Sequence, residues 1–266
     1  MLELNRTVRF CLNDESALRT PADNTYAGWP AMRGLGRYYE IDVTCRGQAD
    51  AVTGYFINIT QIDAAVRSEV LPYLQGIINA SQAADPPMGE LLRTMVRRLQ
   101  PQLQHSVAAV RLRLTPTYEL CLESDAMHQI ELSQSYEFSA AHRLHVEQLP
   151  ASENQRIFGK CNNPAGHGHN YHITVVVRAP IDAQGHSLRV ADLDRVVDQT
   201  LIKRWDHKNL NVDVPEFGDV NSSVENISRL AFEHLAPAVR SLGEGVTLAS
   251  VSVHETGKTV CTYRGE

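Results

Sequence analysis

The feature that most constrains the fold of this chain is a long-range internal repeat. Four segments of the first half match four segments of the second half in the same order: Val8–Phe10 with Tyr136–Phe138, Gly34–Val43 with Gly166–Val175, Gln61–Val66 with Asp192–Val197, and Leu99–Leu103 with Leu235–Val239. Self-similarity at a nearly constant period indicates duplicated structural units. We therefore expect two tandem units, residues 1–124 and 132–266, joined by a short connection.

Within each half the hydrophobic pattern predicts two strands, two helices and two strands. In the second half, apolar residues recur at helical spacing over 190–201 and 224–235, and residues 173–177, 246–253 and 259–264 are typical of strands. The first half has the corresponding helical patterns over 59–70 and 91–99. Ser222 followed by Glu225 fits a capping box that would open the last helix. An antiparallel sheet with two helices on one apolar face belongs to the α+β class.

Composition and charge narrow the classes of function. Hydrophobic residues make up 43% of the chain and charged residues 21%, as in folded globular proteins. The net charge is −6 without a basic run, which gives little support to binding of nucleic acid or membranes. With no long apolar run and no secretion-signal pattern at the start, we expect a cytoplasmic protein. The five cysteines include no CxxC pair, so neither a disulfide framework nor a thiolate zinc site is predicted.

Three histidines of the second half suggest a metal site. His167 and His169 are two residues apart, so they point the same way if the strand that follows already includes them. His142 closes another alternating segment, which begins at Tyr136. Three histidines without a fourth protein ligand are the arrangement of a catalytic zinc, which keeps one position for water or substrate. The alternative is that these histidines are ordinary half-buried polar residues.

Four blocks of the second half resemble the 6-pyruvoyl-tetrahydropterin synthase family, which also contains the 6-carboxy-tetrahydropterin synthases of queuosine biosynthesis. The blocks are residues 138–144, 161–171, 205–211 and 254–256. The resemblance covers Leu132–Glu266 and implies the tunnelling fold (T-fold), whose units assemble as trimers into a barrel and stack as two rings. A tandem chain could form such a barrel from three copies, so we expect a homo-oligomer.

The resemblance also implies a reaction and residue roles. Family members are zinc-dependent lyases that act on 7,8-dihydroneopterin triphosphate, eliminating triphosphate to give 6-pyruvoyl-tetrahydropterin. By position, His142, His167 and His169 would hold Zn²⁺; Cys161, Asp206 and His207 would be catalytic; and Glu255, Glu225 and Ser223 would bind the pterin. For the triphosphate, the candidates are Arg143, Lys160 and Lys208.

Two alternatives stay open at this point. The chain could instead release acetaldehyde and form 6-carboxy-tetrahydropterin, although the five residues between Cys161 and His167 resemble the 6-pyruvoyl branch. It could also be a non-catalytic module that binds a pterin or a metal, because the first half lacks the chemical residues. Opposite His142, Cys161, His167 and His169 the first half has Asp14, Trp29, Leu35 and Arg37.

Overall fold

The structure is a computed structural model that describes residues 1–12, 36–80 and 86–265. It divides into two compact units, one formed by residues 1–132 with 180–187 and the other by residues 133–179 with 188–266. Three residues compared between the halves, Asp14, Trp29 and Leu35, lie outside the described residues. Each unit is described separately below.

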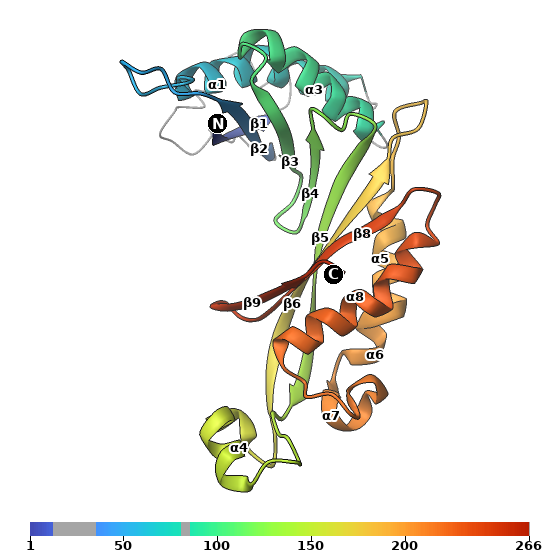
Figure 1. Ribbon diagram of the computed structural model, residues 1–266. Coiled ribbons are helices and arrows are strands. Elements are labelled where there is room, and N and C mark those ends of the chain that lie inside the picture. The colour runs from blue at the N-terminus through green and yellow to red at the C-terminus, as the bar shows by residue number, and fades with distance from the viewer. Residues whose placement is uncertain (13–35, 81–85, 266) are drawn as a thin grey trace. The chain divides into compact units, whose positions relative to one another are not determined.

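Among the described residues, the first unit consists of four strands with helices packed against them (Figure 1). Its elements are β1 (Leu2–Leu12), β2 (Arg37–Gly47), α1 (Ile59–Ala65), a π-helical turn (Val66–Val70), α2 (Leu71–Asn79), α3 (Met88–Gln102), β3 (Val107–Arg113) and β4 (Tyr118–Glu123). Antiparallel pairing joins β1 to β2, β2 to β3 and β3 to β4. Because side chains alternate along a strand, β2 buries Ile41, Val43 and Cys45.

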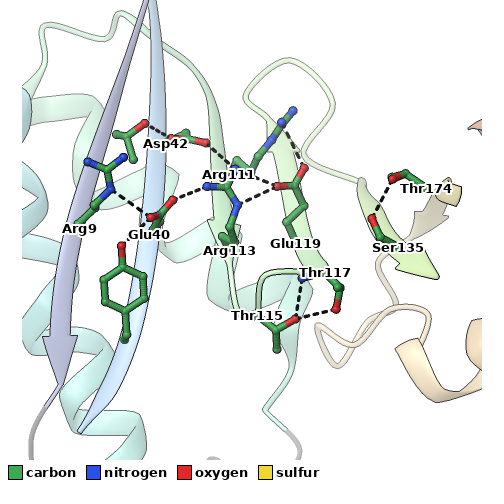
Figure 2. Close-up of polar contacts among 12 residues, drawn as sticks. Arg9, Glu40, Asp42, Arg111, Arg113, Thr115, Thr117, Glu119, Ser135 and Thr174 are labelled. Carbon is green, nitrogen blue, oxygen red and sulfur yellow. Dashed lines mark hydrogen bonds and ion pairs between the residues drawn. The ribbon is translucent and has the colours of Figure 1, made fainter. Parts of the chain in front are cut away.

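The opposite face of the first unit's sheet carries a network of charges, shown in Figure 2. Glu40 of β2 pairs with Arg9 of β1, at 3.1 Å, and with Arg113 of β3. Glu119 of β4 pairs in turn with Arg113, at 3.2 Å, and with Arg111, at 3.3 Å. Acidic and basic side chains thus alternate across the strands, which avoids like charges directly opposite one another.

The second unit has the same order of main elements, with additional short helices. Its elements are β5 (Gln129–His142), α4 (Ala151–Phe158), a 3₁₀ turn (Gly159–Asn162), β6 (His167–Pro180), α5 (Val190–Val197), a π-helical turn (Asp198–Ile202), α6 (Lys203–Trp205), β7 (Lys208–Asn209), α7 (Leu210–Asp213), a 3₁₀ turn (Pro215–Phe217), α8 (Val224–Arg240), β8 (Thr247–Thr256) and β9 (Thr259–Tyr263). In Figure 1, α5 and α8 pack together along one face of the strands. The predicted α+β class with antiparallel strands is confirmed.

Sequence periodicity did not predict α4, which lies in the connection between β5 and β6. Asn154 holds α4 in place. Its buried side chain accepts a hydrogen bond from the Val146 amide and donates one to the Val146 carbonyl, both at 2.8 Å. The buried residue of α4 is this polar side chain, so the helix lacks the stripe of apolar residues on which a prediction from periodicity relies.

The predicted capping box at the start of α8 is wrong by one residue. The N-cap is Ser223, whose hydroxyl accepts a hydrogen bond from the Asn226 amide at 3.4 Å. Ser222 is fully buried, and its hydroxyl donates instead to the side chain of Asn211 at 3.2 Å. Because Ser222 is buried against the end of β5, its hydroxyl is not available to the helix, and Ser223 caps α8 instead.

The aromatic core of the second unit ends at a charged hydrogen-bond cluster. Trp205 is fully buried and packs edge-on against Phe138 and Phe217, with ring centroids 6.0 and 5.3 Å away. Its indole N–H donates to Glu216 at 3.1 Å, and Arg204 donates to the same carboxylate at 2.9 Å. This cluster fixes the chain just before Asp206.

Over the part of the chain that the structure describes, no helix has the length and apolar character needed to cross a membrane.

We expect Glu216 to stabilise the second unit at neutral pH. Burial alone would raise the pKa of Glu216, but hydrogen bonds from Trp205 and Arg204 outweigh burial and hold that pKa below its ordinary value. A lowered folded-state pKa contributes stability above the unfolded value of about 4.3, and this contribution is lost as the pH falls through the folded value. Glu216→Gln should therefore lower the free energy of unfolding at pH 7 by about 1–3 kcal/mol, and by less near pH 3.5.

Urea denaturation at the two pH values measures this difference. The matched control is Glu233→Gln, which removes a carboxylate from a more exposed pair with Arg229 on α8 and should change stability by about 1 kcal/mol or less. An equal loss for Glu216→Gln at both pH values would contradict the prediction.

Candidate metal centre and active site

Three imidazole rings converge where β5 ends and β6 begins. The Nε2 atoms of His142 and His167 are 3.1 Å apart. With His169, one nitrogen from each ring lies within 4.8 Å of the others. His142 is buried and the other two rings are partly buried. These three nitrogens could hold one metal ion.

Strand geometry explains the convergence. His167 and His169 both belong to β6, so the predicted extended conformation is present and their side chains share a face with buried Tyr171. The turn before β6 passes close to β5. Gly166 has φ +73°, and a Cβ at this position would lie 3.0 Å from the carbonyl oxygen of His142. Glycine therefore permits both the left-handed conformation and the close approach.

A backbone hydrogen bond orients His142. Its side chain is fully buried, and its Nδ1 lies 2.7 Å from the carbonyl oxygen of Ser222. A carbonyl can only accept, so Nδ1 carries the proton and donates, and Nε2 faces the other histidines. Burial lowers the pKa of His142, although the bond to Ser222 opposes this effect, and burial also lowers the pKa of His167. Neutral imidazoles are the form that binds metals.

Sequence reasoning missed this role of Ser222. The residue acts through its main-chain carbonyl, which every residue possesses, so no side-chain pattern could have identified it. Its burial and its contacts depend on the packing of the α8 N-terminus against the end of β5.

Glu255 of β8 lies against the histidines. One carboxylate oxygen is 3.5 Å from Nε2 of His142 and 3.8 Å from Nε2 of His169, and the side chain is 20% exposed. The sequence interpretation assigned this carboxylate to the pterin. In the structure its neighbours are imidazole nitrogens.

Asp206 and His207 form a hydrogen-bonded pair beside β5. One carboxylate oxygen of Asp206 accepts from the Ser139 amide and the other from Nδ1 of His207, each at 2.8 Å. The Ser139 hydrogen bond, assisted by His207, lowers the pKa of Asp206. His207 has φ 56°, and its amide donates to the Ser139 carbonyl at 2.6 Å. The left-handed turn therefore holds a carboxylate–imidazole pair whose ring is 81% exposed.

A hollow of about 540 Å³ is lined by His207 of this pair and by His169 of the histidine cluster. His207 and Lys208 line it on one side, and His169 and Asn170 of β6 on the other. Arg143, another candidate for the triphosphate, lines a different hollow of about 560 Å³. The candidate cations are thus distributed over more than one cavity.

Cys161 lies in the 3₁₀ turn between α4 and β6. Its carbonyl accepts a hydrogen bond from the Leu144 amide at 2.9 Å, which holds the turn against the residues after β5. Burial raises the pKa of Tyr171, and the charges of Glu255 and Cys161 add to this rise. The Tyr171 ring packs edge-on against His169, with centroids 5.5 Å apart.

Ser223 and Glu225 occupy the first turn of α8. Ser223 is the N-cap, and the carbonyl of Glu225 accepts a hydrogen bond from the Ser228 hydroxyl at 2.9 Å. Both residues follow closely after Ser222, whose carbonyl holds His142. The start of α8 therefore adjoins the cluster through the main chain.

Comparison with known proteins places this arrangement in a family. The family model described as 6-pyruvoyl tetrahydropterin synthase matches residues 131–266. The human protein named 6-pyruvoyl tetrahydrobiopterin synthase is 42% identical over 139 residues, which are 52% of this chain and 93% of the human protein. The Drosophila melanogaster protein of the same name is 41% identical over 135 residues, 50% of this chain and 79% of that protein.

A solved structure of the Caenorhabditis elegans 6-pyruvoyl tetrahydropterin synthase also aligns, with 37% identity and a TM-score of 0.47, over 52% of this chain and 96% of that chain. The family match spans half of the present chain and includes all three histidines. This chain is an enzyme that belongs to the 6-pyruvoyl tetrahydropterin synthase family.

Proposed function

We propose that the chain is a zinc-dependent lyase that acts on 7,8-dihydroneopterin triphosphate, eliminates triphosphate and gives 6-pyruvoyl-tetrahydropterin. The observation that carries this proposal is the convergence of three imidazoles within the residues that match the family. The names of the relatives favour the 6-pyruvoyl product over the 6-carboxy product.

Zinc suits the donor set. Three neutral imidazole nitrogens are the ligands of many catalytic zinc sites, and a second-sphere hydrogen bond such as that from His142 to Ser222 orients a zinc-binding histidine. His142, His167 and His169 would hold the ion. Bound zinc would polarise a side-chain oxygen of the substrate and so acidify the neighbouring carbon-bound proton.

The remaining residues would move protons and position the substrate. Cys161 would take and return the side-chain protons, and Asp206 would orient the His207 imidazole toward the hollow that it shares with His169. Glu255 and Glu225 would accept the parallel N–H donors of the pterin edge, and Ser223 would contact the same ring. The His207 ring is exposed and lines the hollow, where a substrate could reach it.

The chain would be a tandem pair of T-fold units. Irregular features recur at one spacing, which supports duplication: the bulge at Thr44/Cys45 corresponds to that at Val176/Val177, and the π-helical turn at Val66 to that at Asp198. Positions 44 and 176, and 66 and 198, each differ by 132, as do the aligned glycines 34 and 166. Bulges and π-turns are distinctive backbone features, so chance agreement is a weak explanation.

The first unit would have no part in the chemistry. Strand register assigns Glu255 a counterpart in the first unit, because Ile41 pairs with Leu112 as Ile173 pairs with Val253. The counterpart is therefore Leu114. Arg37 stands opposite His169, and neither leucine nor arginine can ligate zinc. Catalysis would belong to the second unit.

A first test follows the product. Purified protein given 7,8-dihydroneopterin triphosphate should release triphosphate and form a product with the mass of 6-pyruvoyl-tetrahydropterin. Because zinc supplies the polarisation, chelation should abolish turnover and added Zn²⁺ should restore it, as followed by mass spectrometry. Acetaldehyde among the products would replace the proposal with the 6-carboxy activity, and turnover unaffected by complete metal removal would refute zinc dependence.

A second test separates an enzyme from a binding module. Cys161→Ala should keep its zinc content, because the thiol is not among the proposed ligands, but turnover should fall by about 100-fold or more through loss of the base. Steady-state rates with metal analysis give both quantities, and Cys121→Ala in the first unit serves as the control. Unchanged turnover in Cys161→Ala would remove this residue from the mechanism.

A third test concerns assembly. We propose that three tandem chains close into one barrel, because β1 in the first unit and β9 in the second each pair with a single neighbour among the described strands. Edge strands left without a second neighbour expose backbone donors and acceptors, and closure of the sheet satisfies them. Light scattering should report a trimer or a multiple of it, whereas a stable monomer at working concentration would refute this assembly.

A further inference from the structure

The carboxylate of Glu255 faces nitrogen lone pairs. Nδ1 of His142 donates to the Ser222 carbonyl at 2.7 Å, so in the neutral ring Nε2 presents a lone pair toward the cluster. Nε2 of His167 lies 3.1 Å away and a carboxylate oxygen of Glu255 lies 3.5 Å away. The Glu255 carboxylate and the His142 lone pair, 3.5 Å apart, repel one another unless a cation lies between them.

The separations match those between ligands of one ion. Zinc ligands lie about 2.0–2.1 Å from the metal, so two ligands of a tetrahedral site are about 3.3 Å apart. The two distances from His142 Nε2, 3.1 Å to His167 and 3.5 Å to Glu255, bracket this value. The distance from Glu255 to His169 Nε2, 3.8 Å, is slightly longer. A small movement of one carboxylate would complete the set.

The fold directs Glu255 toward this position. In the pairing of β6 with β8, His172 lies opposite His254, so the next step along the ladder brings Glu255 opposite Tyr171. Side chains opposite one another share a face of the sheet, which here is the face of His169. Nε2 of His169 is buried and, among the described residues, has no hydrogen-bond partner. A buried nitrogen without a partner indicates a missing ligand or ion.

We propose that Glu255 is the fourth metal ligand in the substrate-free enzyme. This inference rests on the metal site of the proposed function and adds a protein ligand for its open coordination position. Three histidines leave one position open, and the Glu255 carboxylate occupies that position until a substrate oxygen replaces it. The released carboxylate is then free to accept the N–H donors of the pterin, so metal and pterin compete for one side chain.

The test replaces zinc with Co²⁺, whose visible spectrum reports its ligands. Full-length apoprotein and Glu255→Gln are titrated with Co²⁺ in competition with a chelator, and the spectra of the loaded proteins are compared. Loss of an outer-sphere partner typically weakens metal binding by roughly 10- to 100-fold. Loss of a direct ligand in Glu255→Gln should weaken Co²⁺ binding by at least this factor. The spectrum should also change as water replaces the carboxylate oxygen.

The control is Glu137→Gln. Glu137 also has a carboxylate oxygen close to an imidazole, 3.2 Å from His172, but both side chains are exposed and belong to the other face of the strands. This variant should match the wild type in Co²⁺ affinity and in spectrum. A loss of affinity in Glu137→Gln equal to that in Glu255→Gln would show a general effect of charge and overturn the proposal.

The outcomes separate this inference from the proposed function. Equal affinity and equal spectra for wild type and Glu255→Gln would overturn the inference and leave the metal site intact, as would weaker binding with an unchanged spectrum. If the wild type binds no Co²⁺, the proposed function fails together with the inference. If Glu255→Gln does not fold, azide is added to the Co²⁺-loaded wild type instead. With Glu255 in the fourth position, the spectrum should not change at low azide concentration. A spectral shift at low azide concentration would show an open position and overturn the inference.

Discussion

The hydrogen bond from buried His142 to the carbonyl of Ser222 is the interaction on which the site depends. It fixes the ring orientation and the tautomer, and it ties the end of β5 to the start of α8. A fully buried imidazole without this partner would leave a polar group unsatisfied. The same bond leaves Nε2 free to meet the histidines of β6, so packing and chemistry share one contact.

The two units show how one backbone pattern carries different side-chain chemistry. On the open face of the first unit, Thr7 and Asp42 form a hydrogen bond between β1 and β2; in the second unit Ser135 and Thr174 do so between β5 and β6. The buried faces also correspond, since Phe10 contacts Tyr39 as Phe138 contacts Tyr171. The aromatic pair therefore occurs in both units. The three histidines that could hold a metal ion belong to the second unit.

The enzyme exposes the parts that would act on a substrate and buries the parts that position them. His207 is 81% exposed, but its partner Asp206 is anchored by the Ser139 amide, and the preceding Trp205 is completely buried. The chain thus changes from core to solvent within three residues. Such a change gives an exposed imidazole a fixed orientation, because its backbone cannot move independently of the aromatic core.

The sequence by itself determined the order of the main strands and helices in each half, the alternation of faces along the strands and the grouping of His167 with His169, because these depend on local periodicity and on spacing along one strand. It also indicated His142 as the third member, and the structure brings the three together. Only the tertiary structure decided that Ser222 orients His142, that Ser223 caps α8 and that Glu255 lies beside the imidazoles. The His142–Ser222 and Glu255–imidazole contacts join segments distant in sequence through a main-chain group or a strand register. The cap is local, but Ser223 takes it because Ser222 is buried against Asn211 and His142. None of the three leaves a pattern in the residue types.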